Sequence, residues 1–112
     1  MRSELEAAIR GRIEAVAPQL VGDLWGRQKV TILITRLDVS STSRAADGEA
    51  QAMLFADTPD AFPVDALIAS LREPLSINGS GYRLRARLTG IAERIEEMHA
   101  VCRIYLAIEV MQ

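Results

Sequence analysis

Two stretches of the chain constrain its fold more than any other. Residues 82–88 alternate strictly between apolar and basic side chains, and residues 101–110 form an apolar run that is rich in β-branched residues. An alternation with a period of two places successive side chains on opposite faces of a β-strand. We therefore expect two long strands, paired antiparallel, that form a wall on which helices pack.

The alternation also predicts which side chains of these strands face the core. In the first strand, the core-facing residues should be Tyr82, Leu84, Ala86 and Leu88, and the outward-facing residues Arg83, Arg85 and Arg87. In the second strand, one face should carry Cys102, Ile104, Leu106, Ile108 and Val110, and the other Val101, Arg103, Tyr105, Ala107 and Glu109. The first of these two faces is apolar throughout, and the second is mixed in character.

Two helices are expected before these strands. Residues 3–17 place apolar side chains three and four positions apart, with Ser3 as an N-terminal cap and Pro18 as the stop. Gly11 weakens this helix by about 1 kcal/mol relative to alanine, and close packing is one reason for a glycine there. Residues 63–72 show the same spacing and predict a second helix with one apolar face.

Strand formers dominate residues 29–39, which we expect to be a strand. Residues 49–56 fit a helix or a strand, and we prefer a strand because the segment is short and has turn signals on both sides. Between them, residues 40–48 are predicted to be a mobile loop that becomes ordered against a partner. Residues 89–99 should extend the strand that precedes them and turn near residues 94–98, with a short helix as the alternative.

Two further segments are expected to be connectors. Residues 18–28 show no clear period, and residues 76–81 are predicted to be a flexible turn. The element order is therefore α-β-β-α-β-β. This order predicts a single α+β domain over residues 1–112, with a mainly antiparallel sheet of about four strands and two helices packed on it.

Composition argues against several classes of protein. Of the 112 residues, 49% are apolar, which is enough for a hydrophobic core. The net charge of -2 argues against nucleic acid as a specific ligand. Cys102 is the single cysteine, so no disulfide can form within these residues. Residues 1–6 lack an apolar signal core, and no stretch is long enough to span a membrane. We expect a cytoplasmic protein that does not act at a membrane.

The sequence holds no combination of residues that predicts catalysis. His99 and Cys102 are the only histidine and cysteine, and two ligands do not make a closed zinc site. If residues 98–102 are extended, these two side chains point to opposite faces. Cys102 lies in an apolar run and is expected to be a buried structural thiol. We predict no catalytic, cofactor-binding or metal-binding residue, no cofactor and no enzymatic activity.

The strongest charge feature is the series Arg83, Arg85 and Arg87, which Arg103 on the neighbouring strand would extend. Three interpretations stay open. The arginines could form a solvated strand face that carboxylates balance, namely Glu93, Glu96, Glu97 and Glu109. They could pair with carboxylates of a neighbouring subunit. They could also bind phosphate, although the aromatic residues that single-strand binders use make up only 4% of the chain.

We predict that subunit contacts involve these four arginines, the 40–48 loop and the only tryptophan. The loop contributes Ser41, Arg44 and Asp47. Trp25 is a candidate anchor because tryptophan is enriched at interface hot spots, but it also fits a partly buried packing position.

The order and size of the expected elements resemble those of the tail-terminator (tail-completion) and related neck proteins of long-tailed bacteriophages and prophages. The segments that carry the resemblance are residues 4–13, 64–71 and 102–110. It covers most of the chain as a pattern of elements and includes no diagnostic motif. One departure is that the segment between the first helix and Lys29 is short and has few strand formers.

The resemblance implies a structural function without catalytic residues. Members of this family assemble as rings, typically hexameric, that cap the tail tube, stop its growth and join it to the head. It implies a homo-oligomer with tail-tube and head-connector proteins as partners, first in the cytoplasm and then in the virion. The alternatives are a small cytoplasmic regulatory or nucleic-acid-binding domain that uses the arginine face, and a small-molecule enzyme or binding domain.

Overall fold

The structure of the chain is a computed structural model that describes residues 2–24, 26–39, 46–94 and 99–111. Within these residues the helices are α1 (Arg2–Val16) and α2 (Val64–Arg72), with short 3-10 turns at Pro18–Leu20 and Pro59–Ala61. The strands are β1 (Asp23–Leu24), β2 (Arg27–Gln28), β3 (Val30–Val39), β4 (Ala46–Ala56), β5 (Leu75–Ile77), β6 (Ser80–Arg94) and β7 (His99–Val110).

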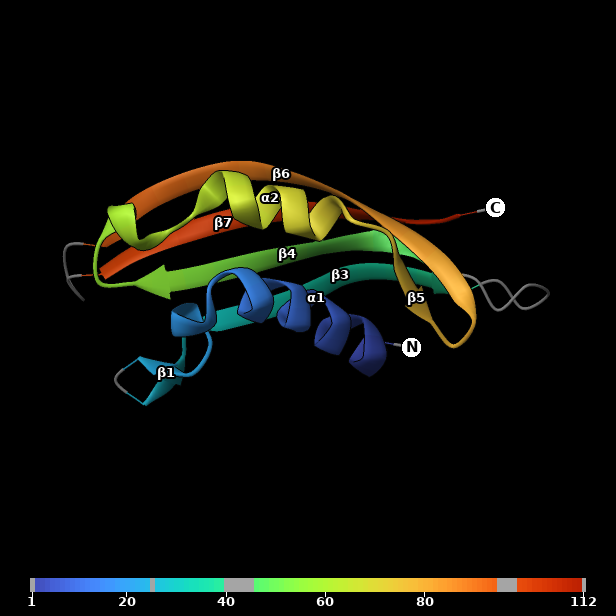
Figure 1. Ribbon diagram of the computed structural model, residues 1–112, viewed down its shortest axis with the longest axis horizontal. Coiled ribbons are helices and arrows are strands. Elements are labelled where there is room, and N and C mark those ends of the chain that lie inside the picture. The colour runs from blue at the N-terminus through green and yellow to red at the C-terminus, as the bar shows by residue number, and fades with distance from the viewer. Residues whose placement is uncertain (1, 25, 40–45, 95–98, 112) are drawn as a thin grey trace.

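Five of the strands form one antiparallel sheet with the order β3-β4-β7-β6-β5. Helices α1 and α2 lie on one face of it, so the domain has two layers (Figure 1). In the part of the chain that the structure describes, no helix covers the opposite face. The predicted α+β class, with an antiparallel sheet and two helices, is confirmed. The sheet has one strand more than predicted.

The core lies between the helices and the sheet. From α1 it takes Leu5, Ile9 and Ile13, which are four residues apart and therefore share one face of the helix. From α2 it takes Leu67 and Leu71. The sheet contributes alternate residues of its strands, including Val30, Ile32, Ile34, Ala50, Ala52, Leu54, Tyr82, Leu84, Ala86, Cys102, Ile104, Leu106 and Ile108.

Two residues that were expected to face the core lie at its margin. Leu88 is 40% exposed, and Val110 is half-buried. Leu88 is nevertheless on the helix side of the sheet, because its cross-strand partner is the buried Ile104. The reason is length, since β6 has 15 residues and α2 has 9. At about 3.4 Å per residue in a strand and about 1.5 Å in a helix, α2 covers only part of β6.

The predicted turn at residues 76–81 is too long, because its two ends belong to strands β5 and β6. Leu75 and Ile77 are buried in the core, and β5 pairs with the start of β6. Only Asn78 and Gly79 make the turn, with φ angles of 52° and 83° that suit a tight two-residue hairpin. The connector predicted at residues 18–28 likewise contains the short β1–β2 pair.

The predicted loop at residues 40–48 is too long at its C-terminal end, because β4 begins at Ala46. Asp47 and Gly48 pair with Asp38 and Leu37 and do not form a turn. The rest of the predicted loop, residues 40–45, lies outside the described residues. The preference for a strand at residues 49–56 is confirmed by β4.

The predicted strand extension is confirmed, and the alternative helix is wrong. β6 continues to Arg94, which pairs with His99 at the start of β7. The pairing shifts between Leu88 and Gly90, so β6 has one extra residue there, which is a β-bulge. The expected turn falls on residues 95–98, which lie outside the described residues.

Arg12 joins the two helices by binding the C-terminal end of α2. Its guanidinium donates hydrogen bonds to the carbonyl oxygens of Ser70 (2.9 Å), Glu73 (3.2 Å) and Pro74 (2.7 Å). The last carbonyl groups of a helix have no partner within the helix, and a nearby cation stabilises them. This side chain therefore links the two helices.

Replacing Arg12 with lysine should destabilise the fold. An ammonium group lacks the planar fork that lets one guanidinium serve several acceptors, and hydrogen bonds of charged groups contribute about 1.5–3 kcal/mol. We expect Arg12→Lys to lose most of that amount in the free energy of unfolding, measured by urea denaturation. Arg10→Lys is the control and should lose less, because Arg10 donates to one backbone carbonyl oxygen, that of Val30 (3.0 Å), and makes only one long bond besides, to Oε1 of Gln28 (3.4 Å). If Arg12→Lys were as stable as the wild type, Arg12 would not stabilise the contact between the two helices.

Candidate protein interface on the outer sheet face

The candidate site is the face of the sheet that points away from the helices, which we call the outer face. The strand pairing places on it Thr31, Leu33, Arg36 and Asp38 of β3, Asp47, Glu49, Gln51, Met53 and Phe55 of β4, Arg83, Arg85 and Arg87 of β6, and Val101, Arg103, Tyr105, Ala107 and Glu109 of β7. A register shift between Ile34 and Arg36 returns Arg36 to this face.

The three arginines of β6 lie exposed on the outer face, as the alternation predicts. The register sets Arg83 opposite Glu109. The ion pair, however, forms diagonally between Arg85 and Glu109, with 3.2 Å between Nε and Oε1. Arg87 lies over the ring of Tyr105, its cross-strand neighbour, at 4.9 Å from the ring centroid. This distance is within the range of a cation–π interaction.

A second group of polar side chains joins β3, β4 and β7 on the outer face. The Tyr105 hydroxyl donates a hydrogen bond of 2.7 Å to Oε1 of Glu49. On the other side of Glu49, Nε of Arg36 lies 3.9 Å from Oε2, and Arg36 also pairs with Asp38. The bond to Glu49 raises the pKa of Tyr105, and the bond to Asp38 raises the pKa of Arg36. These contacts orient the side chains of the face. They also pair the charge of Arg36 with carboxylates of the same chain.

Three arginines of the outer face, Arg83, Arg87 and Arg103, have no carboxylate partner in the described part of the chain. No described Asp or Glu oxygen lies within 4.0 Å of the Arg83 or Arg103 guanidinium. Both side chains are exposed. A guanidinium presents five donors in a fork that matches a carboxylate. Arg83 and Arg103, with Arg87 between them in the sheet, can therefore receive carboxylates from another molecule.

The structure brings five of the predicted contact residues together on the outer face, namely Arg83, Arg85, Arg87, Arg103 and Asp47. The other three, Trp25, Ser41 and Arg44, lie outside the described residues. Of the carboxylates expected to balance the arginines, Glu109 does pair with Arg85. The side chains of the others, Glu93, Glu96 and Glu97, also lie outside the described part.

Sequence reasoning did not name Arg36, Glu49 and Tyr105 as candidate contact residues, although the alternation placed Tyr105 on the mixed face of its strand. Glu49 and Tyr105 meet because β4 and β7 are neighbours in the sheet, but they are 56 positions apart in the chain. No local pattern indicates which strands are neighbours. The available signal was the alternation within residues 49–56, which places Glu49 and Gln51 on a polar face.

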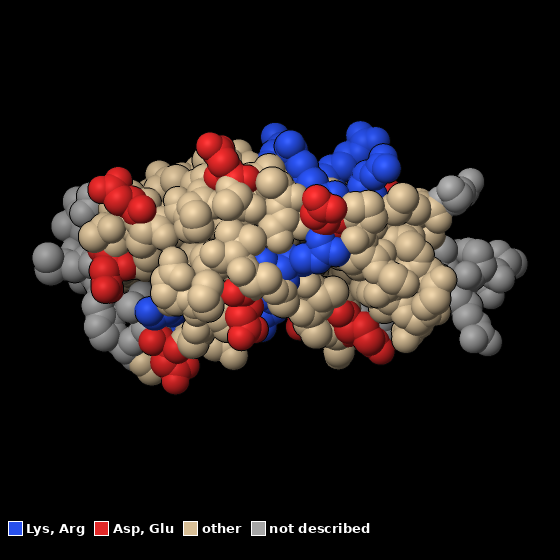
Figure 2. Space-filling view, in the orientation of Figure 1, with Lys and Arg blue, Asp and Glu red and all other residues tan. Residues whose placement is uncertain are grey.

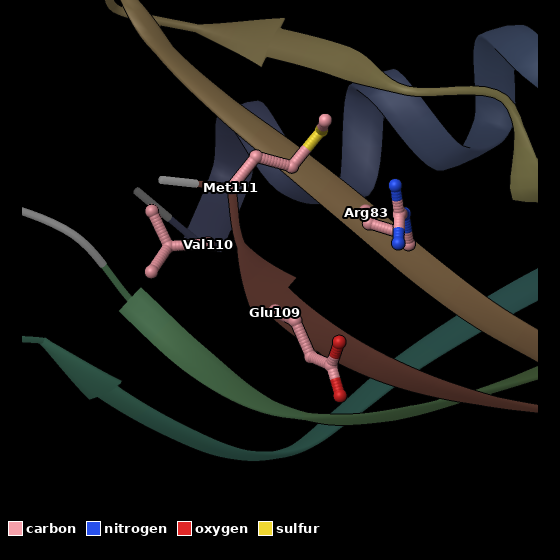
Figure 3. Close-up of a pocket in the computed structure, with 4 residues that line it drawn as sticks. All are labelled: Arg83, Glu109, Val110 and Met111. Atoms are coloured by element: carbon pink, nitrogen blue, oxygen red, sulfur yellow. The ribbon is translucent and has the colours of Figure 1, made fainter.

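An open hollow of about 220 Å³ lies at one end of the outer face (Figure 3). It is lined by Arg83 of β6 and by Glu109, Val110 and Met111 at the end of β7. The lining combines one cation, one carboxylate and two apolar side chains. An enclosed apolar pocket is typical of small-molecule sites, whereas an open and mixed surface suits a side chain of a protein partner.

The helix side of the molecule has a different charge pattern. Figure 2 shows acidic side chains spread over this side, while basic side chains lie along the border that β6 forms and in the middle of this side. Arginines of both helices donate to backbone carbonyl oxygens within the fold, namely Arg2, Arg10, Arg12 and Arg72. Exposed carboxylates of this layer include Glu14, Asp57, Asp60, Asp65 and Glu73. The outer face thus offers arginines without carboxylate partners, among carboxylates of its own, and the helix side offers exposed carboxylates.

His99 and Cys102 do not form a site, because they lie on opposite faces of β7. Cys102 is buried in the core beside Leu54, whereas the His99 ring packs edge-to-face against Phe55 with centroids 5.6 Å apart. Burial raises the pKa of the Cys102 thiol to about 11. Among the residues that the structure describes, no group of three or more His, Cys, Asp and Glu side chains could hold a metal ion.

Cys102 should be inert to thiol reagents in the folded chain. The thiolate is the reactive form, and a pKa of about 11 leaves on the order of one thiol in ten thousand ionised at neutral pH. We expect labelling by a disulfide reagent at pH 7 to proceed at the rate of unfolding and to be complete in urea. Rapid labelling of the folded chain would show that Cys102 is accessible and reactive.

No model of a protein family, no curated protein and no solved structure matches this chain. Neither of the two described helices is long and apolar enough to cross a membrane.

Proposed function

We propose that the chain is a structural subunit of a bacteriophage or prophage tail or neck, which forms an oligomeric ring that caps the tail tube or joins the tail to the head. The observation that carries the proposal is the outer face, on which Arg83 and Arg103 have no carboxylate within 4.0 Å among the described residues. Such a face suits a protein neighbour that supplies the carboxylates.

The charge distribution favours other copies of this chain as the neighbours. The outer face offers arginines, and the helix side offers exposed carboxylates such as Glu14 and Asp65. A contact between the outer face of one copy and the helix side of the next uses two different surfaces. Contacts of this heterologous kind generate rings when the rotation between copies closes.

Apolar side chains on the outer face would supply most of the affinity. Leu33 is 52% exposed, and Met53 and Phe55 of the neighbouring strand are half-buried. Exposed ion pairs contribute about 0–1 kcal/mol each, so the arginines would fix the orientation of the partner more than its affinity. Burial of apolar area yields about 25 cal/mol per Å².

The arrangement of the elements supports the resemblance to tail-terminator and neck proteins. Helix α1, the β3–β4 hairpin, α2 and the long β6–β7 hairpin follow one another in the expected order. The molecule is elongated, with extents of 48 × 22 × 21 Å, and the strands extend beyond the helices (Figure 1). Projecting hairpins would let one subunit of a ring reach the next.

Nucleic-acid binding is the second candidate function. It is favoured by Arg83, Arg87 and Arg103, which form a basic group without described carboxylate partners. Glu49 and Glu109 on the same face would repel phosphate, which is why we favour a protein partner. Nucleic-acid binding that weakens steeply with salt would support this candidate, and no binding even at low salt would eliminate it.

Growing tail tubes test the proposed function. The purified chain is added to the polymerising tail-tube protein of the same phage or prophage, and the tubes are imaged by negative-stain electron microscopy. We expect shorter tubes with a ring at one end. Arg103→Glu should lose this effect, whereas Arg27→Glu, the same charge change on β2, should keep it. Tubes of unchanged length with bare ends would contradict the proposal.

A further inference from the structure

The two edges of the five-stranded sheet are closed to different degrees. At the β3 edge, Arg2 and Arg10 of α1 donate to the carbonyl oxygens of Ile34 (2.7 Å) and Val30 (3.0 Å). The Val30, Ile32 and Ile34 side chains are all buried. Helix α1 therefore occupies this edge at the carbonyl groups of Val30 and Ile34.

The β6 edge is paired only at its beginning. β5 pairs with Ser80 through Tyr82, and beyond Tyr82 no described strand lies on that side of β6. The Met111 N–H donates to the Gly81 carbonyl oxygen (2.8 Å). The N–H and C=O groups of the odd-numbered residues of β6 before the bulge therefore point toward β7. Because these directions alternate along an antiparallel strand, the peptide groups of the even-numbered residues Leu84, Ala86 and Leu88 face the edge.

One side chain occupies part of this edge. The Arg72 guanidinium of α2 donates to the Ala86 carbonyl oxygen, at 2.8 Å from one terminal nitrogen and 3.1 Å from Nε. This contact also shows that the Ala86 carbonyl group points away from β7. The structure places no described strand or arginine against the edge-facing groups of Leu84 and Leu88.

The core is also open along this edge. Leu88 and Ile91 pair with Ile104 and Cys102, both of which are buried on the helix side. Leu88 and Ile91 therefore face the same side, yet each is 40% exposed. The corresponding side chains of β3 are buried beneath α1. An added strand with apolar side chains would cover both residues and extend the core.

We propose that the β6 edge from Leu84 to Ile91 binds an extended segment of a partner protein by strand addition. The segment would alternate between apolar and acidic residues. Its apolar side chains would cover Leu88 and Ile91, and its acidic side chains would lie on the outer face beside Arg85 and Arg87. Strand addition gives affinity through the backbone and specificity through alternate side chains.

Charge complementarity selects the occupant. The outward-facing residues of an added strand would lie beside the three arginines of β6. Among the described residues, only Arg85 of these three has a carboxylate within 4.0 Å. The first half of the β3 edge of another copy is a poor occupant, because arginines of α1 already take the carbonyl groups of Val30 and Ile34. The inference does not depend on ring formation, since the edge belongs to a single chain.

The test uses a capped peptide of alternating valine and glutamate, labelled with a fluorophore. We expect saturable binding that is at least roughly tenfold tighter than binding of the matched valine–lysine peptide. Hydrogen exchange should slow at the backbone amides of Leu84 and Leu88. A peptide with proline in place of valine should not bind, because it cannot donate along the ladder.

Two leucine variants locate the site. Leu88→Glu should weaken peptide binding at least roughly tenfold, whereas Leu33→Glu should not, although Leu33 is also an exposed leucine on an edge strand. Equal effects of both variants, protection on β3, or no saturable binding would overturn the inference. Sedimentation of the same samples reports ring formation separately, so a chain that assembles yet ignores the peptide would leave the proposed function standing.

Discussion

Replacing Leu84 with alanine is expected to lower the free energy of unfolding by about 2–5 kcal/mol. Leu84 is 1% exposed and faces the helices from β6, opposite the buried Ile108 of β7. Removing it leaves a cavity in a close-packed core, and the loss is a large part of the about 5–15 kcal/mol that stabilises a typical domain. Urea denaturation followed by circular dichroism measures the change.

Arg85→Ala is the matched control on the next residue of the same strand. The Arg85 side chain is 69% exposed, and its ion pair with Glu109 is exposed as well. We expect a change of about 0.5 kcal/mol or less in the free energy of unfolding. If Arg85 contacts a neighbouring subunit, its loss should weaken assembly more than folding. Equal losses of stability from Leu84→Ala and Arg85→Ala would show that β6 does not have two different faces.

Gly48→Ala is expected to destabilise the β3–β4 pair. A Cβ atom at this position would lie 2.1 Å from the carbonyl oxygen of Arg36, which is backbone and cannot rotate away. The clash falls beside the register shift of β3 between Ile34 and Arg36. Overpacking of this kind costs about 1–3 kcal/mol, and more where backbone must move. Thermal and urea denaturation measure the loss.

Gly11→Ala makes the same chemical change in an open place. Gly11 is exposed on α1, and a Cβ atom there would meet nothing within 4 Å. The structure therefore gives no support to close packing as the reason for this glycine. We expect the variant to gain about 1 kcal/mol from the higher helix propensity of alanine. Gly48→Ala as stable as the wild type would contradict the close approach of β3 and β4.

The buried faces of the long elements could be predicted from the sequence, because the spacing of apolar residues within an element indicates which of its faces is buried. The alternation from Tyr82 to Ala86 matches the burial of β6, and the spacing of Leu5, Ile9 and Ile13 matches the buried face of α1. The strand at residues 49–56 followed from its length and from the turn signals beside it.

The order of the strands in the sheet and the exposure of the residues at its margin could not be predicted, because both depend on long-range packing. β5 has three residues, which is too short for a period to be recognised. Leu88 fits the apolar alternation, but its exposure depends on where α2 ends. The contact between Glu49 and Tyr105 depends on β7 lying between β4 and β6, and one sequence does not reveal that order.

Sedimentation velocity of the wild type and of Arg103→Glu tests most directly the claim that the outer face joins subunits. Arg103 is exposed and has no described carboxylate partner, so the substitution should leave the thermal melting of the single chain unchanged. We predict that the wild type and the Arg27→Glu control sediment as a closed oligomer, while Arg103→Glu sediments as a monomer. A wild type that stays monomeric at every concentration, or an Arg103→Glu variant that assembles like the wild type, would contradict the claim.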